Sequence, residues 1–155
     1  MPPVMLALLL LASAVQPAPG DAKAAIVRTL DEWHAAAAAA DETLYFSFFT
    51  EDAVFLGTDP KERWTRDEFR RWAHPFFARG KAWDMKSTAR WISMSRDGST
   101  AWFDENVMSK SLGPVRGSGV LVQDRGAWKV AQYNLSVPIP NDRFDAVRKM
   151  ISPAP

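Results

Sequence analysis

The sequence changes its character near Lys86, and this change constrains the fold more than any other feature. Beyond it, four segments are rich in residues that favour strands: 86–95, 100–110, 116–123 and 128–137. Asp97-Gly98 and Arg125-Gly126 stand between successive segments as hairpin turns. Because a tight turn joins antiparallel strands, the pattern predicts an antiparallel meander.

These strands carry apolar side chains on both faces. Trp102 and Met108 fall on one face, whereas Phe103 and Val107 fall on the other, because side chains alternate along a strand. A sheet with one wet face would alternate more cleanly between apolar and polar residues. We therefore expect helices to cover one face and a second copy of the chain to cover the other, in a homodimer.

The residues ahead of the sheet have helical patterns. Asp21 can cap a helix that runs to about Ala39, and Asp41 can cap a second, shorter helix. The second helix is expected to carry four apolar residues: Leu44, Tyr45, Phe48 and Phe49. Residues 53–56 then form a short apolar strand. Together with the meander, these helices predict an α+β fold.

A third helix is expected after a loop at residues 57–64. Thr65 and Glu68 have the spacing of a capping box, in which a hydroxyl and a carboxylate each satisfy a free backbone N–H. Pro75 removes one N–H inside this helix, so we expect a kink or a break there. Gly80 is a natural end for the helix.

Residues 1–20 differ from the rest of the chain because they contain no charged side chain. Val4 to Ala12 is a short apolar run, shorter than the roughly 20 residues that span a bilayer. Ala12-Ser13-Ala14 has the small-residue pattern of a cleavage site. The segment predicts a secretory signal peptide, cleaved near Ala14 or in the Pro/Gly stretch that follows, and therefore an exported protein, periplasmic or secreted.

The expected organisation is a signal peptide and linker at residues 1–20, a folded domain at 21–142, and a C-terminal helix and tail at 143–155. No stable membrane anchor is expected, since the chain has no Cys to carry a lipid. A net charge of +1 without like-charged blocks argues against nucleic acid as a partner. His34 and His74 have no second His or Cys at ligand spacing, so neither a metal nor a cofactor is predicted.

Three segments carry a resemblance to a known family. They are Phe49-Thr50-Glu51-Asp52-Ala53-Val54, Gly57-Thr58-Asp59-Pro60 with Trp64, and Gly126-Ala127-Trp128-Lys129-Val130-Ala131-Gln132. In this order, over about residues 21–142, they resemble the SnoaL-like branch of the nuclear transport factor 2-like superfamily. The resemblance implies a curved antiparallel sheet wrapped around about three helices. It also implies a cone with a mostly apolar pocket, often in homodimers that pair through the sheet.

The same resemblance indicates where catalytic groups would lie. Ketosteroid isomerases of this fold use a tyrosine on the first helix and two aspartates on strands, at positions that correspond to Trp33, Gly57 and Val120. Polyketide cyclases place an acid–base aspartate on the last strand, at or beside Asn134. Side chains of these four types do not exchange protons near neutral pH. We therefore expect a cavity without such groups, unless Asp59 turns inward.

A small, largely apolar molecule is the expected partner of this cavity. Five aromatic residues are the predicted walls: Trp33, Trp64, Trp72, Phe76 and Trp102. Asp104, Gln132 and Asn134 are the predicted polar contacts, because a few polar groups among apolar neighbours orient a ligand. The alternative for the two amides is hydrogen bonding across strands. Trp64 can belong to a solvated loop or close the cavity as a lid.

Asp104 and Glu105 point to opposite faces of a strand, so one of them can face the cavity. A carboxylate there would lose hydration, its pKa would rise, and it could act as a general base in an isomerase or cyclase. The alternative is a salt bridge with Arg90 or Arg116. Three hypotheses remain: a ligand-binding protein, an enzyme with Asp104 or Glu105 as base, and a structural dimer whose cone is filled by its own aromatic rings.

Overall fold

The structure, a computed structural model, describes residues 19–152, and the predicted signal peptide and cleavage site lie outside them. In chain order the elements are α1 (Pro19–Ala38), α2 (Glu42–Ser47), β1 (Phe49–Leu56), β2 (Arg63–Thr65), α3 (Arg66–Ala78), β3 (Met85–Met94), β4 (Thr100–Ser109), β5 (Gly113–Asp124), β6 (Ala127–Ser136), the 3-10 helix η1 (Asn141–Arg143) and α4 (Phe144–Ile151). Helices pack on a curved sheet in an α+β cone, as the sequence predicts.

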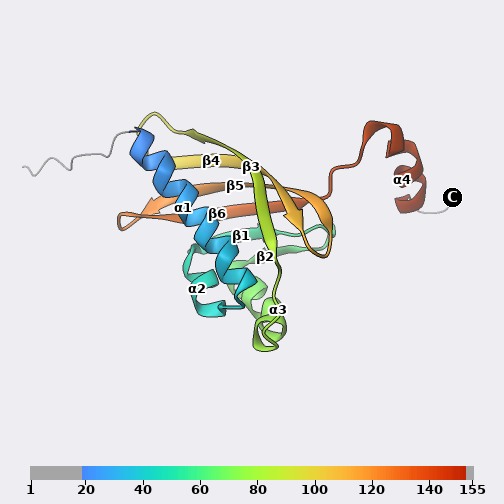
Figure 1. The fold of residues 1–155 in the computed structure, drawn as a ribbon, viewed down its shortest axis with the longest axis horizontal. Helices are drawn as coiled ribbons and strands as arrows, with labels where there is room; N and C mark the ends of the chain where they lie inside the picture. The colour runs from blue at the N-terminus through green and yellow to red at the C-terminus, as the bar shows by residue number, and fades with distance from the viewer. Residues whose placement is uncertain (1–18, 153–155) are drawn as a thin grey trace, which may run out of the picture.

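Six strands form one sheet, in the order β2-β1-β6-β5-β4-β3. Strands β3 to β6 are the predicted antiparallel meander. Gly98 and Gly126 in the turns, and Gly113 at the start of β5, have positive φ angles. Glycine adopts such angles without the steric cost of a Cβ. Strand β1 extends the sheet by running parallel to β6, and β2 pairs antiparallel with β1 (Figure 1).

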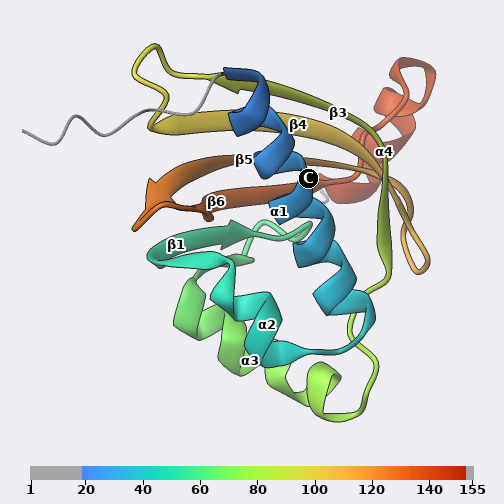
Figure 2. The same cartoon turned by 60° about the vertical axis from the view of Figure 1, so that its left-hand side comes forward.

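Helix α1 lies across the inner face of the sheet, while α2 and α3 lie beside β1 (Figure 2). On α1, Ile26, Leu30 and Trp33 are at most 1% exposed. They share one hydrophobic core with Leu121 and Val130 of the sheet. Burying a side chain of this size contributes about 1.5–3 kcal/mol, so the contact between α1 and the sheet fixes the cone.

Two predicted helix caps are confirmed. The Asp41 carboxylate accepts a hydrogen bond from the backbone N–H of Leu44 at 2.9 Å, which begins α2. At the start of α3, the Glu68 side chain accepts from the Thr65 N–H at 2.8 Å, and the Thr65 hydroxyl accepts from the Glu68 N–H at 3.4 Å. Both pairs satisfy backbone donors that the first turn of a helix leaves free.

The boundary between α2 and β1 differs from the prediction. Helix α2 ends at Ser47, and residues 49–52 belong to β1 rather than to a helix or a turn. The backbone N–H of Val130 donates to the carbonyl of Phe48 at 2.8 Å, and Phe49 pairs with Val130. Pairing with β6 overrides the helical spacing of the aromatic residues, because strand formation depends strongly on the partner edge.

Three smaller expectations also need correction. Helix α1 begins at Pro19, so Asp21 lies in its first turn instead of capping it. Helix α3 continues through Pro75 to Ala78, so the expected break does not occur; its buried residues, on both sides of Pro75, hold the last turn against the core. Arg63 and Trp64, expected in a loop, belong to β2, because they pair with the end of β1.

Helix α4 stands away from the body of the cone (Figure 1). Its apolar residues Phe144, Met150 and Ile151 are exposed. None of the helices within residues 19–152 combines the length and the apolar character needed to cross a membrane.

Candidate functional site

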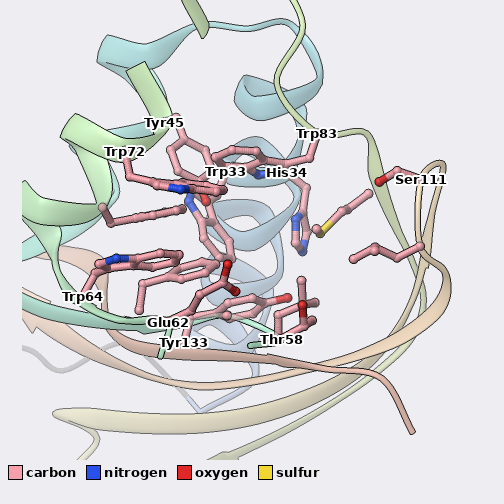
Figure 3. Close-up of a pocket in the computed structure, with 16 residues that line it drawn as sticks. Trp33, His34, Tyr45, Thr58, Glu62, Trp64, Trp72, Trp83, Ser111 and Tyr133 are labelled. Atoms are coloured by element: carbon pink, nitrogen blue, oxygen red, sulfur yellow. The ribbon is translucent and has the colours of Figure 1, made fainter. Parts of the chain in front are cut away.

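A cavity of about 210 Å³ opens on the inner side of the sheet, among α1, α3 and the loop that joins β1 to β2 (Figure 3). It is lined by Trp33, His34, Tyr45, Phe55, Gly57, Thr58, Glu62, Trp64, Phe69, Trp72, Trp83, Met85, Ser111, Leu112, Tyr133 and Leu135. Most of these side chains are aromatic or aliphatic. Only His34 and Glu62 among them bear a group that changes its charge within the ordinary pH range.

One wall of the cavity consists of stacked aromatic rings. The ring centroid of Trp64 lies 4.9 Å from that of Trp72 and 5.6 Å from that of Phe69. Phe55 stacks on Phe69 at 3.9 Å. Such pairs contribute about 0.5–1.5 kcal/mol each beyond the area they bury. The wall is therefore held in place and offers a flat surface to a planar ligand.

His34 connects the cavity to a buried carboxylate. Its ring lines the cavity, and its Nε2 lies 2.7 Å from Oε1 of Glu105. Glu105 is 0% exposed and does not line the cavity itself. Because an ionised carboxylate only accepts hydrogen bonds, Nε2 carries the proton of this bond. The other ring nitrogen, Nδ1, is the one left for a ligand.

Arg90 and Asp31 complete this buried network. Arg90 Nε donates to Oε2 of Glu105 at 2.9 Å, and Arg90 Nη1 donates to Oδ1 of Asp31 at 2.8 Å. The side chain of Arg90 is only 8% exposed, whereas that of Asp31 is 61% exposed. Buried charges are tolerated when they are paired and hydrogen-bonded. The network therefore fixes the ring of His34 against the cavity.

The same pairing keeps Glu105 ionised. Burial by itself raises the pKa of Glu105, but the hydrogen bonds and charges of His34 and Arg90 outweigh it, and the pKa lies below the usual 4.5. This direction is opposite to the one expected for a general base. Glu105 is instead a fixed acceptor, and the salt bridge with Arg90, the alternative that the sequence suggested, is present.

Tyr133 adds a donor to the wall of the cavity. Its hydroxyl lies 3.4 Å from Oε1 of Glu105, to which it donates. Burial, followed by the nearby charge of Glu105, raises the pKa of Tyr133 well above 10.0, so the hydroxyl stays protonated. A Cβ at Gly117 of β5 would collide with this hydroxyl, which explains the glycine there.

Glu62 brings a second carboxylate to the site, this time on the cavity wall. It is half-buried at the end of the loop between β1 and β2. Its Oε2 accepts from the backbone N–H of Asp59 at 3.1 Å. A Cβ at Gly57 would collide with the carboxylate of Glu62. The sequence predicted no proton-transfer group at the position of Gly57 unless Asp59 turned inward; Asp59 does not line the cavity, but Glu62 brings a carboxylate to that place.

Three of the five predicted wall residues line the cavity: Trp33, Trp64 and Trp72. Trp33 is 1% exposed, and its indole N–H has no hydrogen-bond partner within the described part of the chain. Trp72 is 43% exposed, which places it at the mouth. Phe76 packs on Trp72 with ring centroids 5.0 Å apart, but it does not reach the cavity.

Trp102 and Asp104 face away from the cavity. Trp102 is 49% exposed, and Asp104 is exposed beside it on the outer face of the sheet. Glu105 points inward with Phe103 and Val107, because side chains alternate along β4. The predictions of Trp102 as a cavity wall and of Asp104 as a polar contact or base are therefore wrong, because both residues lie on the outer face of β4.

Gln132 and Asn134 miss the cavity because of a β-bulge. Ala131 has no partner on β5, whereas Val130 and Gln132 on either side of it are paired. One extra residue reverses the alternation of all the residues that follow. Tyr133 points inward instead. The two amides, predicted as polar contacts, lie on the other face.

Sequence reasoning missed His34, Glu62 and Tyr133 as cavity residues. The parity of Glu105 with its apolar neighbours Phe103 and Val107 was a usable sign that a buried partner such as His34 was needed. The position of Glu62 depends on how a loop folds, and that of Tyr133 on a bulge, so neither has a comparable periodic signal. Within residues 19–152, no group of three or more His, Cys, Asp or Glu side chains could hold a metal ion.

Solved structures share this fold. A candidate aromatic ring hydroxylase from Novosphingobium aromaticivorans has a TM-score of 0.69 and 20% identity, covering 80% of this chain and 94% of that one. A nuclear transport factor 2-like protein from Pseudomonas putida, of unknown function, has a TM-score of 0.67 and 11% identity, covering 79% and 91%. A candidate scytalone dehydratase from N. aromaticivorans has a TM-score of 0.64 and 16% identity, covering 77% and 89%.

At such identities the likeness concerns the fold. No curated protein matches the sequence. A family model described as a SnoaL-like domain matches residues 26–140, which hold α1 from its third turn and the whole sheet. The chain therefore belongs to the SnoaL-like domain family.

Proposed function

We propose that the protein binds one small, largely apolar, ring-containing molecule in its cavity. The observation that carries the proposal is an open cavity of about 210 Å³ with walls made mainly of aromatic rings. Pockets for drug-sized ligands measure roughly 300–1,000 Å³, whereas an apolar cavity of about 150 Å³ holds benzene. The expected ligand therefore has one or two rings.

The polar groups of the cavity suit a ligand with an oxygen atom. The hydroxyl of Tyr133 and the indole N–H of Trp33 are buried donors on its wall. Leaving a buried donor without a partner costs about 1–3 kcal/mol. A ligand oxygen that accepts from Trp33 would recover this free energy, which favours a ring ketone or a phenol over a hydrocarbon. A purely structural dimer is less well supported, because the protein's own rings leave the cavity open.

Binding can be tested with a named probe and a matched pair of variants. Indan-2-one, a two-ring ketone, is expected to change the tryptophan fluorescence of the wild type on titration. Trp72→Ala removes a cavity wall and is expected to weaken binding about 2- to 10-fold, the worth of one aromatic contact. Trp91→Ala, an exposed tryptophan on the outer face, serves as control. Equal affinity in all three proteins, or no binding of ring ketones and phenols, contradicts the proposal.

Native mass spectrometry of protein purified from its own host adds an unbiased test. A retained small molecule with a mass that fits one or two rings supports the proposal. A retained long-chain lipid contradicts it, because the volume of the cavity is too small for such a ligand.

An isomerase-type enzyme is the second candidate, and one observation favours it. His34 and Glu62 place two titratable groups on the wall of an otherwise apolar cavity. Neither carboxylate first considered as the base can act there, because Asp104 lies on the outer face and Glu105 is sealed from the cavity. The candidate therefore depends on His34 and Glu62.

We also propose that the protein is exported after cleavage near Ala14 or in the Pro/Gly stretch that follows, and that it forms a homodimer through the outer face of its sheet. Trp91, Trp102 and Met108 are about half exposed on that face and would be covered in such a dimer. Terminal sequencing of the protein from its host tests the cleavage. Light scattering tests the dimer, with Trp102→Ser expected to shift the mass toward the monomer; a wild-type monomer contradicts it.

A further inference from the structure

Glu62 occupies the space in which a side chain at residue 57 would lie. A Cβ built on Gly57 would meet Oε2 of Glu62, and would lie 2.9 Å from both its Cβ and its Cδ. Gly57 comes directly after β1, so a side chain there would be held by the end of a strand. The glycine instead makes room for a carboxylate that comes from five residues further along the loop.

The loop holds this carboxylate in a defined position. The Gly57 N–H donates to the carbonyl of Glu62 at 2.9 Å, and the Glu62 N–H donates to the carbonyl of Asp59 at 2.9 Å. The Asp59 N–H donates to Oε2 of Glu62 at 3.1 Å. One carboxylate oxygen therefore anchors the side chain, and the other remains for a ligand.

The surroundings of Glu62 are those of a reactive group. Figure 3 shows its carboxylate pointing into the cavity, between the ring of Trp64 and the hydroxyl of Tyr133. Arg63, the cation next to it in the chain, is exposed and does not line the cavity, nor does any other Lys or Arg. Glu62 therefore has no cationic partner among the residues that line the cavity. A carboxylate held in place on the wall of a binding cavity is the kind of group that acts as a general base.

His34 is the complementary group, since it also lines the cavity and Glu105 fixes its ring through Nε2. Asp31 and Glu105 bring two negative charges to the single guanidinium of Arg90. A protonated His34 would make this cluster neutral. Its Nδ1–H would then be a charged donor for an oxygen of the ligand.

We propose that Glu62 and His34 form a proton-transfer pair that acts on a carbon next to a carbonyl group of a bound ring ketone. Glu62 takes the proton from that carbon, and the C–H electron pair becomes the C=C bond of an enolate. The carbonyl electrons move to oxygen, where His34 donates a hydrogen bond or its proton. Return of the proton from Glu62 to the same carbon regenerates the ketone, and His34 takes back any proton that it gave to the oxygen. Where a C=C bond joins the next two carbons of the ligand, return of the proton to the far carbon of that bond moves the double bond next to the carbonyl and completes an isomerisation. This inference rests on the binding proposed above.

Glu105 and Arg90 are positioning residues in this scheme. Neither lines the cavity, and both act by holding His34. Replacing Glu105 by Gln keeps the size of the side chain but removes its charge. The readout specific to positioning is the pH profile of the reaction, which is expected to change in Glu105→Gln while the affinity for the ketone changes little.

Hydrogen–deuterium exchange of indan-2-one in D₂O tests the proposal. Each removal of a proton by Glu62 is followed by return of a deuteron from solvent, so proton NMR follows the loss of the signal from the carbons next to the carbonyl. The wild type is expected to exceed the rate in buffer by roughly 10²- to 10⁴-fold, the usual worth of a placed acid or base. Fluorescence titration of the same ketone reports binding separately.

Matched variants assign the effect to the two residues. Glu62→Gln is expected to bring the exchange rate near that of buffer, whereas Glu51→Gln, an exposed glutamate on β1, keeps it. His34→Gln is expected to slow exchange, whereas His74→Gln keeps it, because the side chain of His74 is 64% exposed and outside the cavity. Circular dichroism checks that each variant folds.

A rescue variant separates catalysis from support of the loop. In Glu62→Ala the space beside Gly57 is empty, so Gly57→Asp added to it returns a carboxylate to nearly the same place. Glu62→Ala is expected to lose the catalysed exchange. The double variant is expected to exchange at least tenfold faster than Glu62→Ala. Tight binding with exchange no faster than in buffer overturns the proton-transfer pair but keeps the binding proposal. Absence of ketone binding overturns both.

Discussion

The inner and outer faces of the same sheet differ in the burial and pairing of their charged side chains. On the inner face, Glu105 is 0% exposed and is held by Arg90 and His34. On the outer face, its neighbour Asp104 is exposed beside Trp102, which is 49% exposed. Asp104 and Glu105 are neighbours on β4, yet one is a solvated carboxylate and the other belongs to a buried ion network. Composition alone does not distinguish the two residues.

This difference follows from the alternation of side chains along β4. The inner face holds its buried charged side chains, Glu105 and Arg90, in pairs, because burial of an unpaired charge is costly. It therefore carries a small number of acids and bases with fixed partners. The outer face carries apolar and charged side chains together, which suits an interface and not a reaction.

The largest effect is expected from a variant in which the inward and outward side chains at the end of β6 exchange faces. Ala131 is the unpaired residue of β6, and inserting one alanine directly after it would move every later residue of the strand to the opposite face. Tyr133 and Leu135, now buried, would be directed outward, and Gln132 and Asn134 inward. We expect the variant to lose its cooperative thermal transition, as followed by near-ultraviolet circular dichroism. A stable variant with a normal transition would show that β6 can shift its register at little cost.

A second test compares neighbouring residues on opposite faces. Glu105→Ala leaves Arg90 and His34 buried without their acceptor, and the loss of one partner of a buried pair costs about 3–5 kcal/mol. Asp104→Ala removes an exposed group and is expected to change the free energy of unfolding by no more than about 0.5 kcal/mol. Urea denaturation at pH 7 measures both. Equal effects would mean that the buried network does not stabilise the fold.

The acid dependence of stability sharpens the same comparison. The pKa of Glu105 in the folded protein lies below its usual 4.5, so near that pH the unfolded chain binds more protons than the folded one. The stabilisation by Glu105 is complete above pH 4.5 and is lost as the pH falls through the folded pKa. Denaturation between pH 7 and pH 3 is expected to show a smaller acid loss in Glu105→Gln than in the wild type, whereas Asp104→Asn retains the wild-type loss.

Much of the fold was predictable from periodic patterns. The four meander strands, the caps at Asp41 and Thr65, and the α+β class follow from spacing and turn residues. The β1 segment at Phe49 was assigned to a helix because its pairing with Val130, far away in sequence, leaves no local sign.

The candidate site was less predictable for the same physical reason. Trp33, Trp64 and Trp72 reach the cavity, as expected for large rings in an apolar cone. Asp104 was considered on equal terms with Glu105, although parity with buried neighbours already distinguished them. Glu62 reaches the cavity through a loop whose shape depends on the space left at Gly57, and no periodicity encodes that contact.

The smallest expected effect compares Tyr133 with Asn134, two neighbours beyond the bulge. The Tyr133 hydroxyl donates to Glu105 over a long distance of 3.4 Å, so Tyr133→Phe is expected to cost about 0.5–1.5 kcal/mol of unfolding free energy. Asn134→Ala, on the outer face, is expected to cost less than about 0.5 kcal/mol. If the hydroxyl also contacts the ligand, Tyr133→Phe lowers the affinity for indan-2-one while Asn134→Ala leaves it unchanged. The reverse order in either measurement would place Asn134, and not Tyr133, on the cavity side of β6.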